Sequence, residues 1–108
     1  MNVVIVGPDA ESLLAAFEAA DATVAETGQL GNRPALEEAG IVDADVLVLT
    51  DTTFATTIPV AKDLNDGLRV VVYASSSLPE FAKGQADMLL DPELFTPEAI
   101  ATELADEH

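Results

Sequence analysis

Short apolar segments alternate regularly with amphipathic segments along this chain, and that order restricts the possible folds. The run Val46–Leu49 is apolar at every position, which is typical of a strand covered on both faces. Leu13, Phe17 and Ala20 recur at the spacing of one helix face. The pattern predicts strands at residues 3–6, 22–26, 44–50, 69–74 and 86–90. Helices are predicted at 9–20, 34–39 and 78–84 and from 97 onward. A further helix is predicted to begin after a cap at Thr56 or Thr57 and to end near residues 65–67.

Threonine and proline mark two of the predicted helix starts. Thr96 precedes Pro97, and proline is well suited to the first turn of a helix whose cap is threonine. Thr56 or Thr57 is predicted to cap an earlier helix, because Pro59 fits only in its first turn.

Strands that alternate with helices through short connections predict a parallel sheet with right-handed crossovers. We expect an α/β fold of three layers, with five strands in the order 2-1-3-4-5, of the Rossmann-like or flavodoxin-like kind. The length of 108 residues suits a single domain, residues 1–108.

The charge of the chain is strongly negative. Twenty Asp and Glu residues face four Lys and Arg residues, and the formal net charge is −16. Molar salt shortens the Debye length to about 3 Å and screens this repulsion. The acids are spread along the chain, which favours adaptation to a high-salt, haloarchaeal cytoplasm over docking to a basic partner or nucleic-acid mimicry. Four scattered cations predict no binding to nucleic acid.

Targeting and redox features also restrict the function. The N-terminus begins directly with strand residues, and the apolar runs are too short to cross a bilayer, so we expect a cytoplasmic protein without membrane insertion. Cysteine is absent, which excludes disulfides and thiol nucleophiles. The only histidine is the terminal His108, which we interpret as a frayed end.

In a sheet of this order, ligands bind beyond the carboxyl ends of the strands, where the first and third strands are neighbours. The turns at that edge supply the candidate ligand residues, and the acids among them could hold Mg²⁺ or a monovalent cation. A solvated acidic rim is the favoured interpretation in so acidic a chain. The ligand candidates are Gly7, Asp9, Glu26, Thr27, Asp51 and Ser75, and the metal candidates are Asp9 and Asp51.

Residues 36–51 resemble the RCK or KTN domain, the Rossmann-type nucleotide-binding domain that regulates potassium transport. The segments 61–65, 69–74 and 85–93 continue the similarity. The resemblance implies a regulatory domain that pairs with a second copy and binds a dinucleotide at a Gly-x-Gly-x-x-Gly turn. Here only Gly7 matches that turn, and Asp9 and Glu11 repel anions, so we expect no cofactor and no binding of NAD or NADH.

The chain also resembles, more weakly, the receiver domains of response regulators. Asp51 lies where their phosphorylated aspartate follows the third strand, and Ser75 or Ser76 matches their hydroxyl residue. The receiver lysine is replaced by Asp91, which predicts no phosphotransfer because the aspartyl phosphate would lose a cationic contact. The simpler interpretation of Asp51 is a turn residue that hydrogen-bonds nearby backbone.

Two functions of different class follow. The first is a non-catalytic regulatory or scaffolding module that acts by protein docking or self-association, as a homodimer that pairs through the helix at 58–64 and the helices near the fifth strand. The alternative is a sensor that binds a nucleotide or cation at the carboxyl edge of the sheet. An exposed apolar patch beside the third to fifth strands favours the first, and a pocket at that edge favours the second. Lys62 and Arg69 are predicted to be surface charges and Tyr73 a core residue.

Overall fold

The structure is a computed structural model and describes residues 1–8, 11–28, 30–75 and 77–107. Five strands and five α-helices alternate along it, with two short 3₁₀ helices. The strands are β1 (Asn2–Val6), β2 (Thr23–Gly28), β3 (Val46–Leu49), β4 (Arg69–Tyr73) and β5 (Met88–Leu90). The helices are α1 (Glu11–Ala19), α2 (Arg33–Glu38), η1 (Ile41–Asp43), η2 (Thr52–Phe54), α3 (Thr57–Leu64), α4 (Glu80–Lys83) and α5 (Pro97–Glu107).

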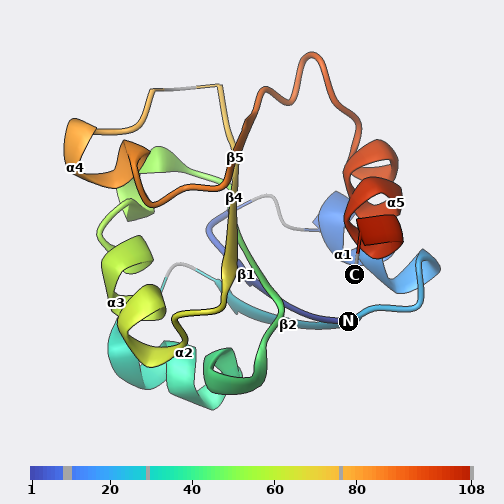
Figure 1. Cartoon of the computed structure of the whole chain (residues 1–108). Coiled ribbons are helices and arrows are strands. Elements are labelled where there is room, and N and C mark those ends of the chain that lie inside the picture. The colour runs from blue at the N-terminus through green and yellow to red at the C-terminus, as the bar shows by residue number, and fades with distance from the viewer. Residues whose placement is uncertain (9–10, 29, 76, 108) are drawn as a thin grey trace.

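The strands form one parallel sheet in the order β2-β1-β3-β4-β5. Figure 1 shows this sheet edge-on, with α2, α3 and α4 on one face and α1 and α5 on the other. The predicted three-layer α/β fold and its strand order are therefore confirmed. β1 lies between β2 and β3, so the point where the strand order reverses is where the sequence places it.

Alternate side chains of the strands enter two separate apolar clusters. Val4 and Val6 of β1 pack in the cluster under α2 to α4, whereas Val3 and Ile5 pack in the cluster under α1 and α5. The four residues of β3 are all buried, as expected for a strand covered on both faces. Burial of each such side chain stabilises the fold by about 1.5 to 3 kcal/mol before entropy is counted.

Thr56 stands at the N-cap position of α3, as predicted, but it forms no capping bond. The 3₁₀ helix η2 runs almost directly into α3, so Thr56 has helical backbone and its side chain makes no capping bond. Thr57 is buried, and its hydroxyl donates to the carbonyl of Gly31 at 3.0 Å. The cap at the last helix is confirmed, because the Thr96 hydroxyl accepts from the amide of Ala99 at 3.1 Å.

Several predicted boundaries also change. β2 continues to Gly28, two residues beyond its predicted end. β5 begins at Met88, because the side chain of Asp87 accepts the hydrogen bond from the Val70 amide in place of a strand carbonyl. The predicted start of the first helix at Asp9 lies outside the described residues, and the described helix begins at Glu11.

Two residues predicted to be surface charges lie against the sheet. The Lys62 ammonium donates to the Leu68 carbonyl at 2.8 Å, and only 24% of its side chain is exposed. Arg69 is half-buried, and its Nη2 lies 3.6 Å from Sδ of Met88. The sequence pattern reveals neither contact.

Candidate functional site

The turn after β1 is held against β3 by a threonine. The Thr50 hydroxyl donates to the carbonyl of Pro8 at 2.6 Å, and the amide of Gly7 donates to the carbonyl of Gly28 at 2.7 Å. Gly7 has a φ of 119°, and a Cβ added there would collide with the Thr50 hydroxyl. Glycine is needed at position 7 because β1 and β3 approach closely, a reason independent of phosphate binding.

Asp51 begins the 3₁₀ helix η2. Its Oδ1 accepts from the amide of Thr53 at 2.9 Å. The interpretation of Asp51 as a turn residue that hydrogen-bonds nearby backbone is confirmed, whereas a role in ligand binding stays a prediction. Asp9, the other metal candidate, lies outside the described residues. Within the described ranges, no group of three or more His, Asp or Glu side chains is arranged to hold a metal ion.

The end of β2 contains a bulge at Thr27. Glu26 pairs with Ile5 and Gly28 with Val6, so Thr27 is the extra residue between the two pairs. The Thr27 hydroxyl is buried and has no hydrogen-bond partner within the described part of the chain. Glu26 is exposed, as a residue of a solvated rim would be.

Ser75 lies apart from these residues. It lines a hollow of about 340 Å³ between the ends of β4 and β5, together with Ser77, Lys83 and Asp91. The structure therefore brings Gly7, Gly28 and Thr50 together and places Ser75 beside the fifth strand. The predicted ligand residues are divided between two places along the same edge of the sheet.

Exposed apolar side chains occur on β5, the edge strand, and on the segments before and after it. Phe81 on α4 is 56% exposed and Leu89 on β5 is 57% exposed. Leu94 and Phe95 follow in the loop before α5 and are also exposed. The sequence analysis named such a patch as a discriminating feature but did not identify these residues, because exposure of an edge strand does not follow from an apolar run.

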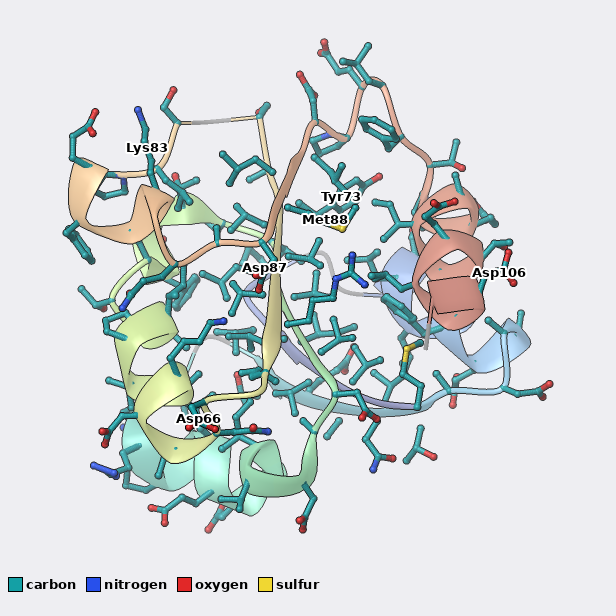
Figure 2. The ribbon with its side chains drawn as sticks, viewed as in Figure 1. Asp66, Tyr73, Lys83, Asp87, Met88 and Asp106 are labelled. Atoms are coloured by element: carbon teal, nitrogen blue, oxygen red, sulfur yellow. The ribbon has the colours of Figure 1, made fainter. Side chains whose placement is uncertain are left out.

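A groove lies on the other side of β5, between that strand and α5. Its volume is about 440 Å³, and its lining residues are Met88, Leu90, Phe95, Ala99, Ile100, Glu103 and Leu104. Figure 2 shows the side chains of Tyr73 and Met88 projecting from the sheet toward α5, while Lys83 lies on α4 beyond the opposite face.

Tyr73 fixes the loop that leads into α5. Its hydroxyl donates to the carbonyl of Phe95 at 2.6 Å. Tyr73 is half-buried and packs against the core, as the sequence predicts, and it also holds this loop through the hydrogen bond. Burial raises the pKa of the Tyr73 phenol, and the negative charges of Glu98 and Asp91 raise it further. Glu98 lies in the first turn of α5, and Asp91 directly follows β5.

Among the described residues, no helix has both the length and the apolar composition of a membrane-spanning segment. Among curated protein sequences, none matches this chain.

Two solved structures are similar to this chain in fold. A protein named for pilus assembly, CpaE, from Burkholderia thailandensis has a TM-score of 0.68 and 17% sequence identity, over 100% of this chain and 99% of that chain. A pilus assembly-related protein from Burkholderia pseudomallei has a TM-score of 0.69 and 17% identity, over 98% of this chain and 87% of that chain. At this identity the likeness shows the fold alone. Residues 3–104 match a sequence family, and the chain belongs to that family of unknown function, DUF7126.

Proposed function

We propose that this chain is a non-catalytic regulatory or scaffolding module that acts by protein association, and that it pairs with a second copy through the α4 side of β5. The observation that carries the proposal is the exposure of Phe81 and Leu89 on that side of the sheet edge. Large apolar side chains that stay exposed together are typical of interaction surfaces. A relation to RCK domains, whose regulatory copies pair, agrees with this proposal.

The charge of this surface suits a second copy. Lys83 on α4 lies 3.2 Å from the carboxylate of Glu80, so an ion pair offsets the acid beside Phe81. A two-fold dimer places the same surface of two copies in contact, and locally balanced charge limits the repulsion between them. β5 is also the last strand of the sheet, so its outer edge is open to a partner.

The helix at 58–64, which the sequence analysis assigned to the dimer contact, is less suited to pairing. Ile58 and Ala61 of α3 are fully buried against the sheet, and Val60 and Leu64 are partly buried in the same cluster. These side chains already have their partners within the chain. We therefore assign the pairing surface to α4 and β5.

The residues at the carboxyl ends of the strands support a non-catalytic role. The Asp51 carboxylate is bonded to the amide of Thr53, and the chain contains no cysteine and no histidine before residue 108. A cysteine nucleophile is therefore absent, and so is a histidine base before residue 108.

Sedimentation equilibrium in molar KCl tests the proposal. The chain of 11.3 kDa is expected to sediment with twice that mass. Leu89→Lys is expected to give the single-chain mass, since it places an ammonium group in the contact. Leu30→Lys is the matched control, because Leu30 is 60% exposed in the loop after β2. A wild-type protein that stays monomeric, or an equal effect of both substitutions, contradicts the proposal.

One observation favours the alternative of a nucleotide or cation sensor. The buried Thr27 hydroxyl has no partner in the described part of the chain, and a ligand at the carboxyl edge could supply one. On that alternative, Mg²⁺ with ATP raises the melting temperature of the wild type and not of Thr27→Val. On the proposal favoured here, neither protein responds.

A further inference from the structure

We infer that the groove between β5 and α5 is a binding site for a small, uncharged aromatic molecule. The inference goes beyond the proposed pairing and does not depend on it, because α4 and α5 lie on opposite faces of the sheet (Figure 1). It gives the groove a ligand of one chemical class.

Apolar side chains from three segments line the groove. Met88 and Leu90 belong to β5, and Ile100 and Leu104 belong to α5. Phe95 lies in the loop between these elements and is 41% exposed. Met88 and Leu90 are only half-buried, although both pack against the cluster under α1 and α5. The fold therefore leaves apolar side chains of its own core partly uncovered at this place.

The helix α5 has a small residue at the groove. Ile100, Ala101 and Leu104 pack in the cluster under α1 and α5, whereas Ala99 is exposed and lines the groove. The side chain of Ala99 is a single methyl group, which leaves space between α5 and β5, and the volume of the groove is about 440 Å³. A larger side chain at position 99 would fill part of that space.

The size of the groove suits a small molecule better than a protein. Pockets for small molecules have volumes of about 300 to 1,000 Å³, and the volume of this groove is within that range. A stable protein interface uses about 20 to 30 residues from each partner, whereas seven described residues line the groove. A second copy of the chain would therefore need a much larger contact surface than the groove provides.

Met88 and Phe95 favour an aromatic ligand. A methionine sulfur makes favourable contacts with aromatic rings, and two aromatic rings attract each other in edge-to-face or offset arrangements. Both side chains are partly exposed, so both can contact a ligand in the groove. Methionine is also unbranched and flexible, so Met88 can adjust to the shape of the ring.

The lining disfavours a charged ligand. Among the described residues that line the groove, Glu103 is the only charged one. Arg69, whose Nη2 lies 3.6 Å from the sulfur of Met88, lines a separate hollow together with Asp43 and Asp45. Any charged group between apolar walls loses hydration, and an anion would also lie near the Glu103 carboxylate. An uncharged ring avoids both costs.

Nuclear magnetic resonance of the methionine methyl groups in molar KCl tests the inference. The chain contains two methionines, Met1 and Met88, and only Met88 lines the groove. The probe is 2-naphthalenemethanol, and the matched anion is 2-naphthoate, which has the same rings and a carboxylate in place of the alcohol. We expect the alcohol to shift the methyl signal of Met88 and not that of Met1. The naphthoate is expected to bind at least roughly tenfold more weakly.

Three results of this titration overturn the inference. They are an unchanged Met88 signal, equal shifts of the two methionine signals, and equal affinities for the alcohol and the naphthoate.

Substitutions locate the ligand. Ala99→Leu is expected to weaken binding of the alcohol roughly tenfold, because the larger side chain fills the groove. Leucine is a good helix former, so we expect α5 to persist, and a thermal melt checks the fold. Thr102→Leu on the same helix and Phe81→Ala on α4 are the matched controls, since both residues are exposed and neither lines the groove. Wild-type affinity in Ala99→Leu, or an equal loss in either control, overturns the inference.

Glu103→Gln tests the preference for an uncharged ligand while it keeps the shape of the groove. It is expected to strengthen binding of the naphthoate and to leave binding of the alcohol unchanged, because it removes the charge that lies near the anion. Naphthoate binding as weak as in the wild type contradicts a selective role of Glu103.

Sedimentation equilibrium of Ala99→Leu separates this inference from the proposed pairing. We expect the variant to have the same mass as the wild type, whether that mass is one chain or two. If Ala99→Leu abolishes a dimer and neither probe shifts Met88, a second copy occupies the groove and the inference is wrong.

Discussion

The carboxylate of Asp87 accepts a hydrogen bond from the backbone amide of Val70 at 2.7 Å, just before β5 begins. The same oxygen lies 3.4 Å from the ammonium group of Lys62, which also donates to the carbonyl of Leu68. One side chain thus joins the edge strand β5 to β4 and to α3. This contact adds to the backbone pairing of β5 with β4.

Loss of the Asp87 carboxylate is expected to destabilise the protein. Asp87→Ala leaves the Val70 amide and the Lys62 ammonium without this acceptor, and we expect a loss of about 1 to 2 kcal/mol in the free energy of unfolding. Urea denaturation in molar KCl measures it. Asp66→Ala is the control, because Asp66 is an exposed acid in the turn after α3. Equal midpoints for the two variants would show that the Asp87 contact has no such role.

Glycine at position 7 is expected to be required for stability. Gly7→Ala places a Cβ against the Thr50 hydroxyl at a φ of 119°, so we expect a loss of roughly 1 to 3 kcal/mol. Gly84→Ala is the matched control. Gly84 has a φ of −74° and no atom within 4 Å of an added Cβ, so alanine there is expected to be neutral or to stabilise by up to about 1 kcal/mol. Thermal melts of the two variants decide the point, and a Gly7→Ala protein as stable as the wild type contradicts the structure of this turn.

The ionisation of Tyr73 is expected to be shifted upward and to affect stability in alkali. Tyr73 is the only tyrosine and the chain has no tryptophan, so the ultraviolet absorbance of tyrosinate reports this group alone. Because the folded pKa is raised above its ordinary value near 10, the stabilisation is fully present below the unfolded pKa and is lost as the pH rises through the folded pKa.

Tyr73→Phe supplies the comparison for that pH dependence. At neutral pH it should reduce stability by about 1 kcal/mol, because the hydrogen bond to the Phe95 carbonyl is removed. The difference between the two proteins should shrink at a pH above the folded pKa of Tyr73. If the pKa of Tyr73 in the folded protein is at or below that of free tyrosine, the phenol is not buried and hydrogen-bonded to the Phe95 carbonyl as described.

Salt is expected to raise stability strongly. A net charge of −16 on 108 residues produces repulsion in dilute buffer that molar KCl screens. Circular dichroism melts over a KCl series measure the effect, with an uncharged osmolyte as the control for preferential exclusion. A melting temperature that stays constant or falls with KCl contradicts adaptation to high salt.

The fold could be predicted from the sequence because its signals are local and repeated. The apolar run Val46–Leu49 specifies a strand buried on both faces, and Thr96 with Pro97 specifies a helix start. Strand order then follows from the handedness of parallel crossovers. Thr56 makes no capping bond, because the 3₁₀ helix η2, which is capped by Asp51, brings the chain to Thr56 with helical backbone.

The candidate site was less predictable, because it depends on contacts between distant residues. Sequence position placed Gly7 and Asp51 at one edge of the sheet, but not the Thr50 hydroxyl that makes glycine necessary. The exposure of Phe81 and Leu89 depends on how much of β5 is covered by the short helix α4. The spacing of apolar residues in the sequence does not reveal this. Lys62 was predicted to be a surface charge because its partners, Leu68 and Asp87, lie in the loops before β4 and β5 and not in its own helix.

Hydrogen–deuterium exchange at two protein concentrations, one above and one below the dissociation constant of the dimer, decides whether the chain associates at the edge of β5. We expect amides of α4 and β5 to exchange more slowly at the high concentration, and amides of β2 and α2 to exchange at the same rate at both concentrations. Protection that is absent at every concentration, or that falls on β2 and α2 while α4 and β5 stay unchanged, would contradict the claim that this chain works through association at the edge of β5.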